Sequence, residues 1–208
     1  MNLFNILRER AMTQPTTIAS RSSRRVVTYR KFWSRIERGT ARLKSEWDVQ
    51  PGDTVAYWGL GHQDALMLYI ATARCGAKLL PLEHASLQEA NVAILREFPV
   101  KILLHDDDVV FDVPPAVPAM VHLSSLIATR CHHTPPVEED AHQPSLISLA
   151  SDSKGGLLSE QKSVYELASD TGTGSAGEFR IAAALFDTDV FAPQVLSTLV
   201  AGGTIVFR

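Results

Sequence analysis

Apolar strand-like segments alternate with helix-like segments through the first half of the chain. A strand, a helix and a second strand that repeat at this interval imply a parallel sheet with helical crossovers. The sequence therefore predicts an α/β fold with parallel-rich sheets and flanking helices. Strands are expected at residues 54–58, 78–82, 101–105 and 120–123, and helices at 63–74 and 86–98.

The two ends of the chain continue this pattern. Apolar spacing predicts a first helix, then a small hairpin, then a long helix that Thr28 caps. The last third repeats the strand and helix rhythm and ends on a strand without a cap, which suggests a fragment of a larger architecture. The expected segments are a helix at 2–13, a hairpin over 18–27, strands at 146–149, 181–186 and 204–207, and helices at 160–169 and 193–200.

A polar, proline-containing stretch at 131–144 predicts a linker or exposed loop. It divides the chain into an N-terminal α/β subdomain, residues 1–130, and a second α/β segment, residues 145–208. The second segment is expected either to pack with the first as one unit or to stand apart. Because a partial fold leaves apolar surface uncovered, we expect a homodimer or a protein partner, with 193–200 and 204–207 as candidate contacts.

Composition excludes several classes of protein. The net charge is -3, so no overall field favours nucleic acid or an anionic membrane. No apolar run approaches the roughly 18 residues that a bilayer-spanning helix needs. Two cysteines, Cys75 and Cys131, form no disulfide framework, so a reducing cytoplasm is expected. The long helix after Thr28 has a basic face, which is either a solvated surface or a nucleic-acid patch.

Residues 145–159 are typical of a phosphate-binding loop that has been altered. They read S-L-I-S-L-A-S-D-S-K-G-G-L-L-S, an apolar run, a small Ser/Gly turn and an expected helical stretch. A strand, a loop and a helix in this order form an anion cradle through backbone N–H groups. Here Asp152 stands in the middle of the turn, and Leu157 and Leu158 stand where a basic residue is expected.

Three segments together resemble the N-terminal part of the adenylate-forming ligases, the family of acyl-CoA synthetases, luciferases and peptide-synthetase adenylation domains. The segments are V-T-Y-R-K-F at 27–32, P-G-D-T-V-A-Y-W-G-L-G-H to A-K-L-L-P-L at 51–82, and L-F-D-T-D-V to G-G-T-I-V-F at 185–207. Their order and spacing carry the resemblance. It implies a fold like the N-terminal subdomains of these enzymes, and chemistry that activates an acid with ATP and Mg²⁺.

The resemblance also implies where this chain departs from the family. The family loop is approximately Y-T-S-G-T-T-G-x-P-K-G, which makes Ser151, Ser153, Lys154 and Gly155 the remaining candidate phosphate-binding residues. Asp152 replaces the first glycine and Leu158 the lysine. One like-charge pair at about 4 Å costs on the order of 4 kcal/mol at an effective dielectric near 20. Asp187 likewise replaces the histidine of the family's "LFH" phrase.

We therefore assign no catalytic residue and expect no cofactor, with ATP or AMP and Mg²⁺ only if residual activity remains. Three functions stay open: an inactive acyl-CoA synthetase-like protein that acts by binding or protein interaction, half of a split ligase completed by a partner chain, or a module that binds a small carboxylic acid. Activity as an acid ligase is expected only with a partner.

Other polar clusters are weaker candidates. Cys131-His132-His133 lacks a second pair of ligands at metal-site spacing, so no metal is expected. His62 either caps a helix or lines a cleft at a strand end. The pair Gly59 and Gly61 lacks the third glycine of a dinucleotide motif. Residues 106–108, three aspartates, either invite a cation or form a solvated turn.

Overall fold

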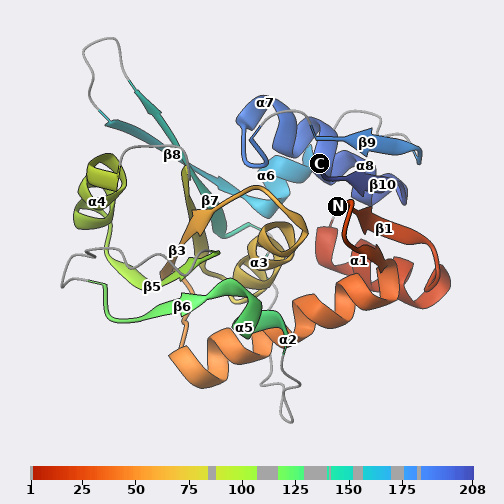
Figure 1. Cartoon of the computed structure of the whole chain (residues 1–208), viewed down its shortest axis with the longest axis horizontal. Coiled ribbons are helices and arrows are strands. Elements are labelled where there is room, and N and C mark those ends of the chain that lie inside the picture. Colours follow the sequence, from red (N-terminus) through yellow and green to blue (C-terminus); the bar gives the residue numbers. More distant parts are fainter. Residues whose placement is uncertain are drawn as a thin grey trace.

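The computed structural model of this chain contains two sheets with helix α3 between them (Figure 1). The six-stranded sheet lies on one side of α3 and the four-stranded sheet on the other. The structure describes residues 2–83, 88–106, 117–128, 140, 142–151, 157–169, 176–181 and 184–208.

The larger sheet has the strand order β6-β5-β3-β4-β7-β8. Every neighbouring pair is parallel except β7 and β8, which are antiparallel. This confirms the α/β fold with parallel-rich sheets. The strands are β3 (Thr54–Gly59), β4 (Lys78–Glu83), β5 (Val100–His105), β6 (Met120–His122), β7 (Pro144–Ser151) and β8 (Leu157–Ser163).

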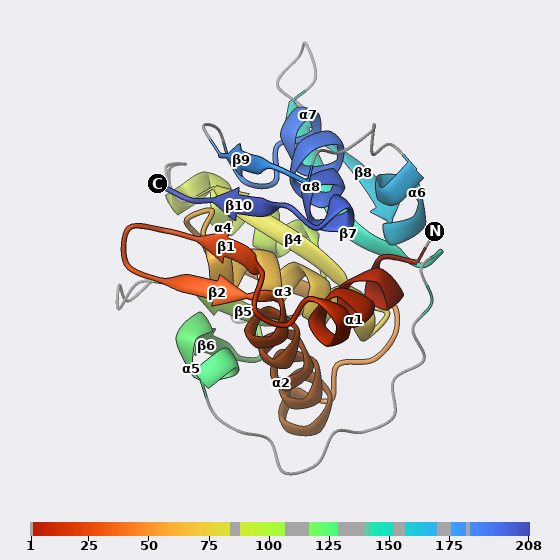
Figure 2. The same ribbon diagram turned by 90° about the vertical axis from the view of Figure 1, so that its right-hand side faces the viewer.

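The smaller sheet joins the two ends of the chain, in the order β2-β1-β10-β9 (Figure 2). β1 and β2 form the predicted hairpin, and β10 pairs in parallel with β1 although more than 180 residues separate Ser20 from its partner Ile205. Strands from both sides of residues 131–144 thus share both sheets; the domain boundaries stay a prediction. The strands are β1 (Ile18–Arg21), β2 (Val26–Thr28), β9 (Glu178–Arg180) and β10 (Thr204–Val206).

The helices begin at recognisable caps. Asn2 caps α1 and Thr28 caps α2 by accepting backbone N–H groups, as the sequence predicts for Thr28. Gly202 ends the last helix in the left-handed conformation that favours glycine. The helices are α1 (Leu3–Thr13), α2 (Tyr29–Trp47), α3 (Gln63–Arg74), α4 (Gln88–Glu97), α5 (Leu123–Ala128), α6 (Val164–Ser169), α7 (Thr188–Val190), the π-helix η1 (Phe191–Leu196) and α8 (Ser197–Ala201).

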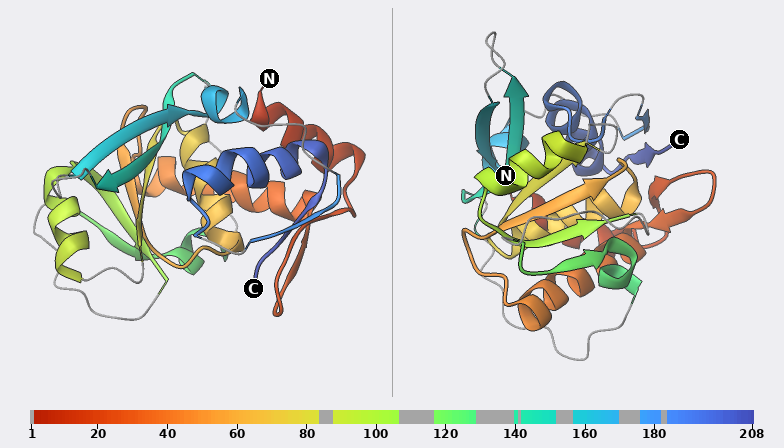
Figure 3. Two further views of the ribbon diagram at one scale, coloured as in Figure 1. Left: turned by 90° about the horizontal axis from the view of Figure 1, so that it is seen from above. Right: turned by 60° about the vertical axis from the view of Figure 1, so that its left-hand side comes forward.

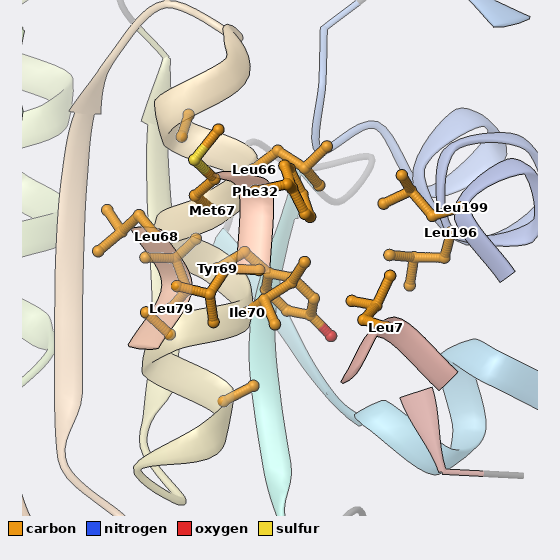
Figure 4. Close-up of a cluster of buried hydrophobic side chains, with 14 of the residues drawn as sticks. Leu7, Phe32, Leu66, Met67, Leu68, Tyr69, Ile70, Leu79, Leu196 and Leu199 are labelled. Carbon is orange, nitrogen blue, oxygen red and sulfur yellow. The ribbon is translucent and has the colours of Figure 1, made fainter. Parts of the chain in front are cut away.

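The main core surrounds α3. Nearly every residue of this helix is buried, including Met67 and Leu68, because elements pack on all its sides. Figure 4 shows Leu7 of α1 pointing toward Leu196 and Leu199 of the C-terminal helices. Apolar side chains from both ends of the sequence therefore complete one core. In the described parts of the chain no helix is both long and apolar enough to cross a bilayer.

Two predicted elements of the last third differ from the structure, one in its start and the other in its existence. The predicted helix at 160–169 begins only at Val164, because Ser163 and Glu166 form a reciprocal capping box that starts it there. The residues before it belong to β8. The predicted strand at 181–186 is wrong: the strand in this region is β9, and Ile181 follows it.

The two C-terminal segments predicted to contact a partner, residues 193–200 and 204–207, pack largely against other parts of the same chain. The apolar side chains of Phe191, Val195, Leu196 and Leu199 are buried in the main core. Strand β10 is hydrogen-bonded on both edges, by β1 and β9. Much of the apolar surface of these two segments is therefore used inside the chain, and their contact with a partner stays a prediction.

Candidate functional site

The altered phosphate-loop segment lies between two antiparallel strands. Ser151 ends β7, and its backbone pairs with Leu157 at the start of β8 (Figure 3). The expected helix after the loop is wrong, because the chain returns along β7 as a strand whose register continues from Leu157 to Ser163. The candidate residues Ser153, Lys154 and Gly155, and the replacement Asp152, fall in 152–156, outside the described residues.

Two of the family replacements can be placed. Leu158, at the position of the family lysine, pairs with Ala150 and leaves 55% of its surface exposed. The position therefore accepts a long, polar side chain without repacking. Asp187, at the histidine position, is exposed and accepts the N–H of Asp189 at 2.9 Å, so it caps α7.

The most densely connected polar cluster lies where β3 and β5 end. The carboxylate of Asp106 accepts the hydroxyl of Tyr57 at 2.5 Å and the backbone N–H of Leu60 at 2.8 Å. Its second oxygen lies 2.8 Å from Nε2 of His62. The oxygen of the Tyr57 hydroxyl also lies 2.7 Å from the carbonyl oxygen of Leu60. We call Tyr57, His62 and Asp106 the β3–β5 clamp.

His62 uses both ring nitrogens in this clamp. Nδ1 accepts the backbone N–H groups of Asp64 and Ala65, at 3.1 and 3.4 Å, and so caps α3. Since Nδ1 accepts, the proton is assigned to Nε2, which then donates to Asp106. This confirms the prediction that His62 caps a helix.

Asp106 is held as a carboxylate. Burial acts to raise the pKa of Asp106, but the hydrogen bonds from His62, Tyr57 and the Leu60 N–H outweigh it and the pKa is lowered. Its side chain is only 14% exposed. For this residue the prediction of a solvated turn is wrong, because its partners sit 44 to 49 positions earlier in the sequence. Asp107 and Asp108 lie outside the described residues.

The clamp occupies the switch point of the sheet. The chain leaves β3 toward β4, and leaves β5 toward β6 on the opposite side. Open α/β sheets bind ligands at this divergence, beyond the carboxyl ends of the strands. Here the Asp106 carboxylate accepts the backbone N–H of Leu60, so the arrangement fixes the loop after β3.

The loop after β3 also explains its glycines. A Cβ on Gly59 would collide with the Asp106 carboxylate and would lie 2.5 Å from the Tyr57 hydroxyl. A Cβ on Gly61 would lie 2.6 Å from Cβ of Leu185, in the segment that carries the family's "LFH" phrase. Close packing, and no dinucleotide site, accounts for this pair of glycines.

Replacing Gly61 by alanine is expected to lower the free energy of unfolding by roughly 1–3 kcal/mol, because the methyl group forces the loop away from Leu185. Leu60→Ala is the control. Leu60 is 57% exposed, and its loss should change stability by less than about 0.5 kcal/mol. Urea unfolding of both variants tests this; equal stabilities would contradict the packing contact.

The sequence predicts no metal site at Cys131-His132-His133. Cys131, His132 and His133 lie outside the described residues. Within the described parts of the chain, no group of three or more His, Cys, Asp or Glu side chains is arranged to hold a metal ion.

Comparison with known proteins identifies the class that this fold represents. The family model described as AMP-binding enzyme matches residues 7–170. This match covers most of the chain, and the chain belongs to the AMP-binding enzyme family. The resemblance to the adenylate-forming ligases is thereby confirmed.

Similar proteins include a ligase and several solved adenylation structures. The D-alanine–D-alanyl carrier protein ligase of Bacillus licheniformis is 25% identical over 123 residues, 58% of this chain and 24% of that protein. The NpsA N-terminal subdomain of Klebsiella oxytoca, in complex with 3-hydroxybenzoyl-AMSN, gives a TM-score of 0.85 at 20% identity. A fatty acyl CoA synthetase of Mycobacterium tuberculosis gives 0.85 at 17% identity.

These matches show the fold of the chain and how much of each matched protein the chain covers. All of this chain aligns with both structures, but it covers only 53% of the NpsA chain and 44% of the synthetase chain. The chain thus spans about half the length of the solved structures it matches, and a quarter of the curated relative. At these identities the structural likeness shows the fold alone.

Two structural features were missed by the sequence prediction. The partnership of Tyr57 with Asp106 joins strand ends far apart in the sequence, and no local pattern marks it. The capping box at Ser163 and Glu166 has a local signal, since S-V-Y-E carries a serine and a glutamate three positions apart. Reading that signal would have placed the start of α6 correctly.

Proposed function

We propose that this chain is a member of the AMP-binding family that does not adenylate an acid on its own and acts through binding or protein interaction. One observation carries the proposal: Asp152 and Leu158 replace the glycine and the lysine of the family's phosphate loop. The first adds a negative charge where phosphates would lie, and the second removes a positive one.

Both replacements weaken the same interaction. A phosphate cradle works through backbone N–H groups and a cation, and adenylation further requires stabilisation of a charged transition state. Repulsion of about 4 kcal/mol from a single carboxylate corresponds to roughly a thousandfold loss of affinity. Lys154 is the remaining cation of the segment.

The geometry of β8 makes a restoring variant practical. Leu158 is half exposed on a strand that pairs with β7, so lysine at this position keeps the hairpin pairing intact. Calorimetric titration with ATP and Mg²⁺ should give no heat of binding with the native chain. The double variant Asp152→Gly with Leu158→Lys should bind, with affinity at least a hundredfold greater.

The remaining outcomes contradict the proposal in different ways. Tight ATP binding by the native chain, or pyrophosphate exchange that depends on an acid, would refute inactivity. If the double variant also shows no heat of binding, Asp152 and Leu158 are not the cause of the lost ATP binding. A Leu158→Ser variant controls for the loss of exposed apolar surface and should show no heat of ATP binding.

Cofactor and partners follow from the same proposal. We infer that ATP, AMP and Mg²⁺ are not resident cofactors. The native chain would instead work with a protein partner or as a homodimer, and a small carboxylic acid is the candidate ligand.

A further inference from the structure

Positive charge is concentrated in one short segment of this chain. Glu37 is the only acidic residue between Arg21 and Lys44. The rest of the chain holds the other 22 of the 23 acidic residues, although the net charge is only -3. Nine of the 20 basic residues lie in the segment: Arg21, Arg24, Arg25, Arg30, Lys31, Arg35, Arg38, Arg42 and Lys44.

The fold gathers most of these residues on one surface. Lys31, Arg35 and Arg38 follow one another on α2 at spacings of four and three, which places them on one face of the helix. Arg24 and Arg25 lie on the β1–β2 hairpin, which leads directly into α2 (Figure 2). We call the following side chains the basic surface: Arg24, Arg25, Lys31, Arg35 and Arg38.

Asp64 ties the hairpin to the helix. Its carboxylate accepts both Nη1 and Nη2 of Arg25, at 3.0 and 2.7 Å, and lies 3.4 Å from Nη1 of Arg35. Two guanidinium groups thus share one carboxylate that is 18% exposed. These ion pairs hold the two halves of the surface together, and Asp64 sets one negative charge against the two positive charges of Arg25 and Arg35.

The surface retains uncompensated charge. Burial lowers the pKa of Arg35, and the neighbouring charges of Arg25 and Arg38 lower it further, although the Asp64 carboxylate acts in the opposite direction. Within the part of the chain that the structure describes, the exposed side chains of Arg24 and Lys31 enter no ion pair. Like charges held this close repel, and an external anion relieves the repulsion.

The surroundings distinguish between classes of anion. Outside residues 21–44 the chain holds 22 acidic and 11 basic residues, so a polyanion that covers a large part of the molecule meets a net negative charge. Bases of single-stranded nucleic acid need exposed aromatic rings to stack on. Trp33 is instead buried between Arg8 and Arg74, and Tyr165 of α6 is the exposed large aromatic among the described residues.

We propose that the basic surface is a docking site for a short acidic segment of a partner protein. Guanidinium groups present forked donors that match carboxylates. From Lys31 to Arg38 the helix face extends about 10 Å, and the hairpin lengthens the surface beyond it. A few neighbouring Asp or Glu side chains fit this length. The inference is independent of whether the chain adenylates an acid.

A direct test uses a dye-labelled peptide of about ten glutamates, with fluorescence anisotropy at low salt. The peptide should bind, and affinity should fall steeply as salt rises, since exposed charges are screened within about 10 Å at 0.1 M. Arg24→Glu with Lys31→Glu should weaken binding roughly tenfold or more. Arg96→Glu, an exposed charge reversal on α4, should leave binding within about twofold.

The same assay with two further probes decides the class of partner. A single-stranded oligonucleotide of matched charge and vesicles rich in phosphatidylserine should both bind more weakly than the peptide. Tighter binding to either probe would overturn the assignment to an acidic protein. So would absence of peptide binding at low salt, or equal loss in Arg96→Glu. Thermal unfolding of each variant verifies that the fold is kept.

Discussion

Replacing Tyr69 by alanine is expected to lower the free energy of unfolding by roughly 3–5 kcal/mol, a large part of the roughly 5–15 kcal/mol that keeps a typical domain folded. Tyr69 lies at the centre of α3 and is fully buried. Its ring meets Phe191 of η1 edge to face, with centroids 4.8 Å apart, and lies near Phe186. Removing the ring empties the junction between α3 and the C-terminal helices.

Tyr69→Phe separates the ring from the hydroxyl. The hydroxyl lies 3.1 Å from Oγ of Ser145, and Ser145 also donates to the carbonyl of Lys162. Because Ser145 keeps that partner, the loss should be only about 1 kcal/mol. Burial raises the pKa of Tyr69 well above its usual range, so the phenol stays neutral at every working pH. Urea unfolding of both variants measures the contributions of the ring and of the hydroxyl to stability. An alanine variant as stable as the phenylalanine variant would contradict the packing role of the ring.

The elements that the sequence predicts correctly are those whose signals lie within the element itself. The strand at β3, the helix α3 and the strand at β4 follow one another, and each has its own apolar pattern and its own turn. Thr28 and Gly202 mark helix ends by their own chemistry. These elements were expected within a residue or two of where they lie.

The unpredictable part depends on distant partners. β8 is polar along most of its length and forms a strand because β7 offers it a hydrogen-bonded edge. β9 is three residues long and exists through its pairing with β10. Asp106 looked like one of three solvated aspartates because nothing near it in sequence shows that Tyr57 and His62 lie above it. Tertiary pairing decides these features, and a single sequence does not display it.

Asp106→Asn is expected to cost roughly 2–3 kcal/mol of unfolding free energy at pH 7. The carboxylate accepts hydrogen bonds from Tyr57, Leu60 and His62. An amide has the same shape but replaces one acceptor oxygen with an NH₂ group. One of those donors must therefore face another donor, and the charge that strengthens the remaining bonds is lost. Asp48→Asn is the control, since Asp48 is 78% exposed and its nearest cation is 4.0 Å away.

The pH dependence gives this prediction a second, independent measurement. The pKa of Asp106 is lowered in the folded chain, so its stabilising effect is complete above the ordinary aspartate pKa of about 3.9 and is lost as the pH falls toward the folded-state pKa. The native chain and Asp106→Asn should therefore differ most near neutral pH and converge in acid. A difference that stays constant down to about pH 3, or no difference at pH 7, would show that the carboxylate does not hold the loop after β3. In that case the packing of Gly61 against Leu185 would be the contact to test next as the one that positions the loop.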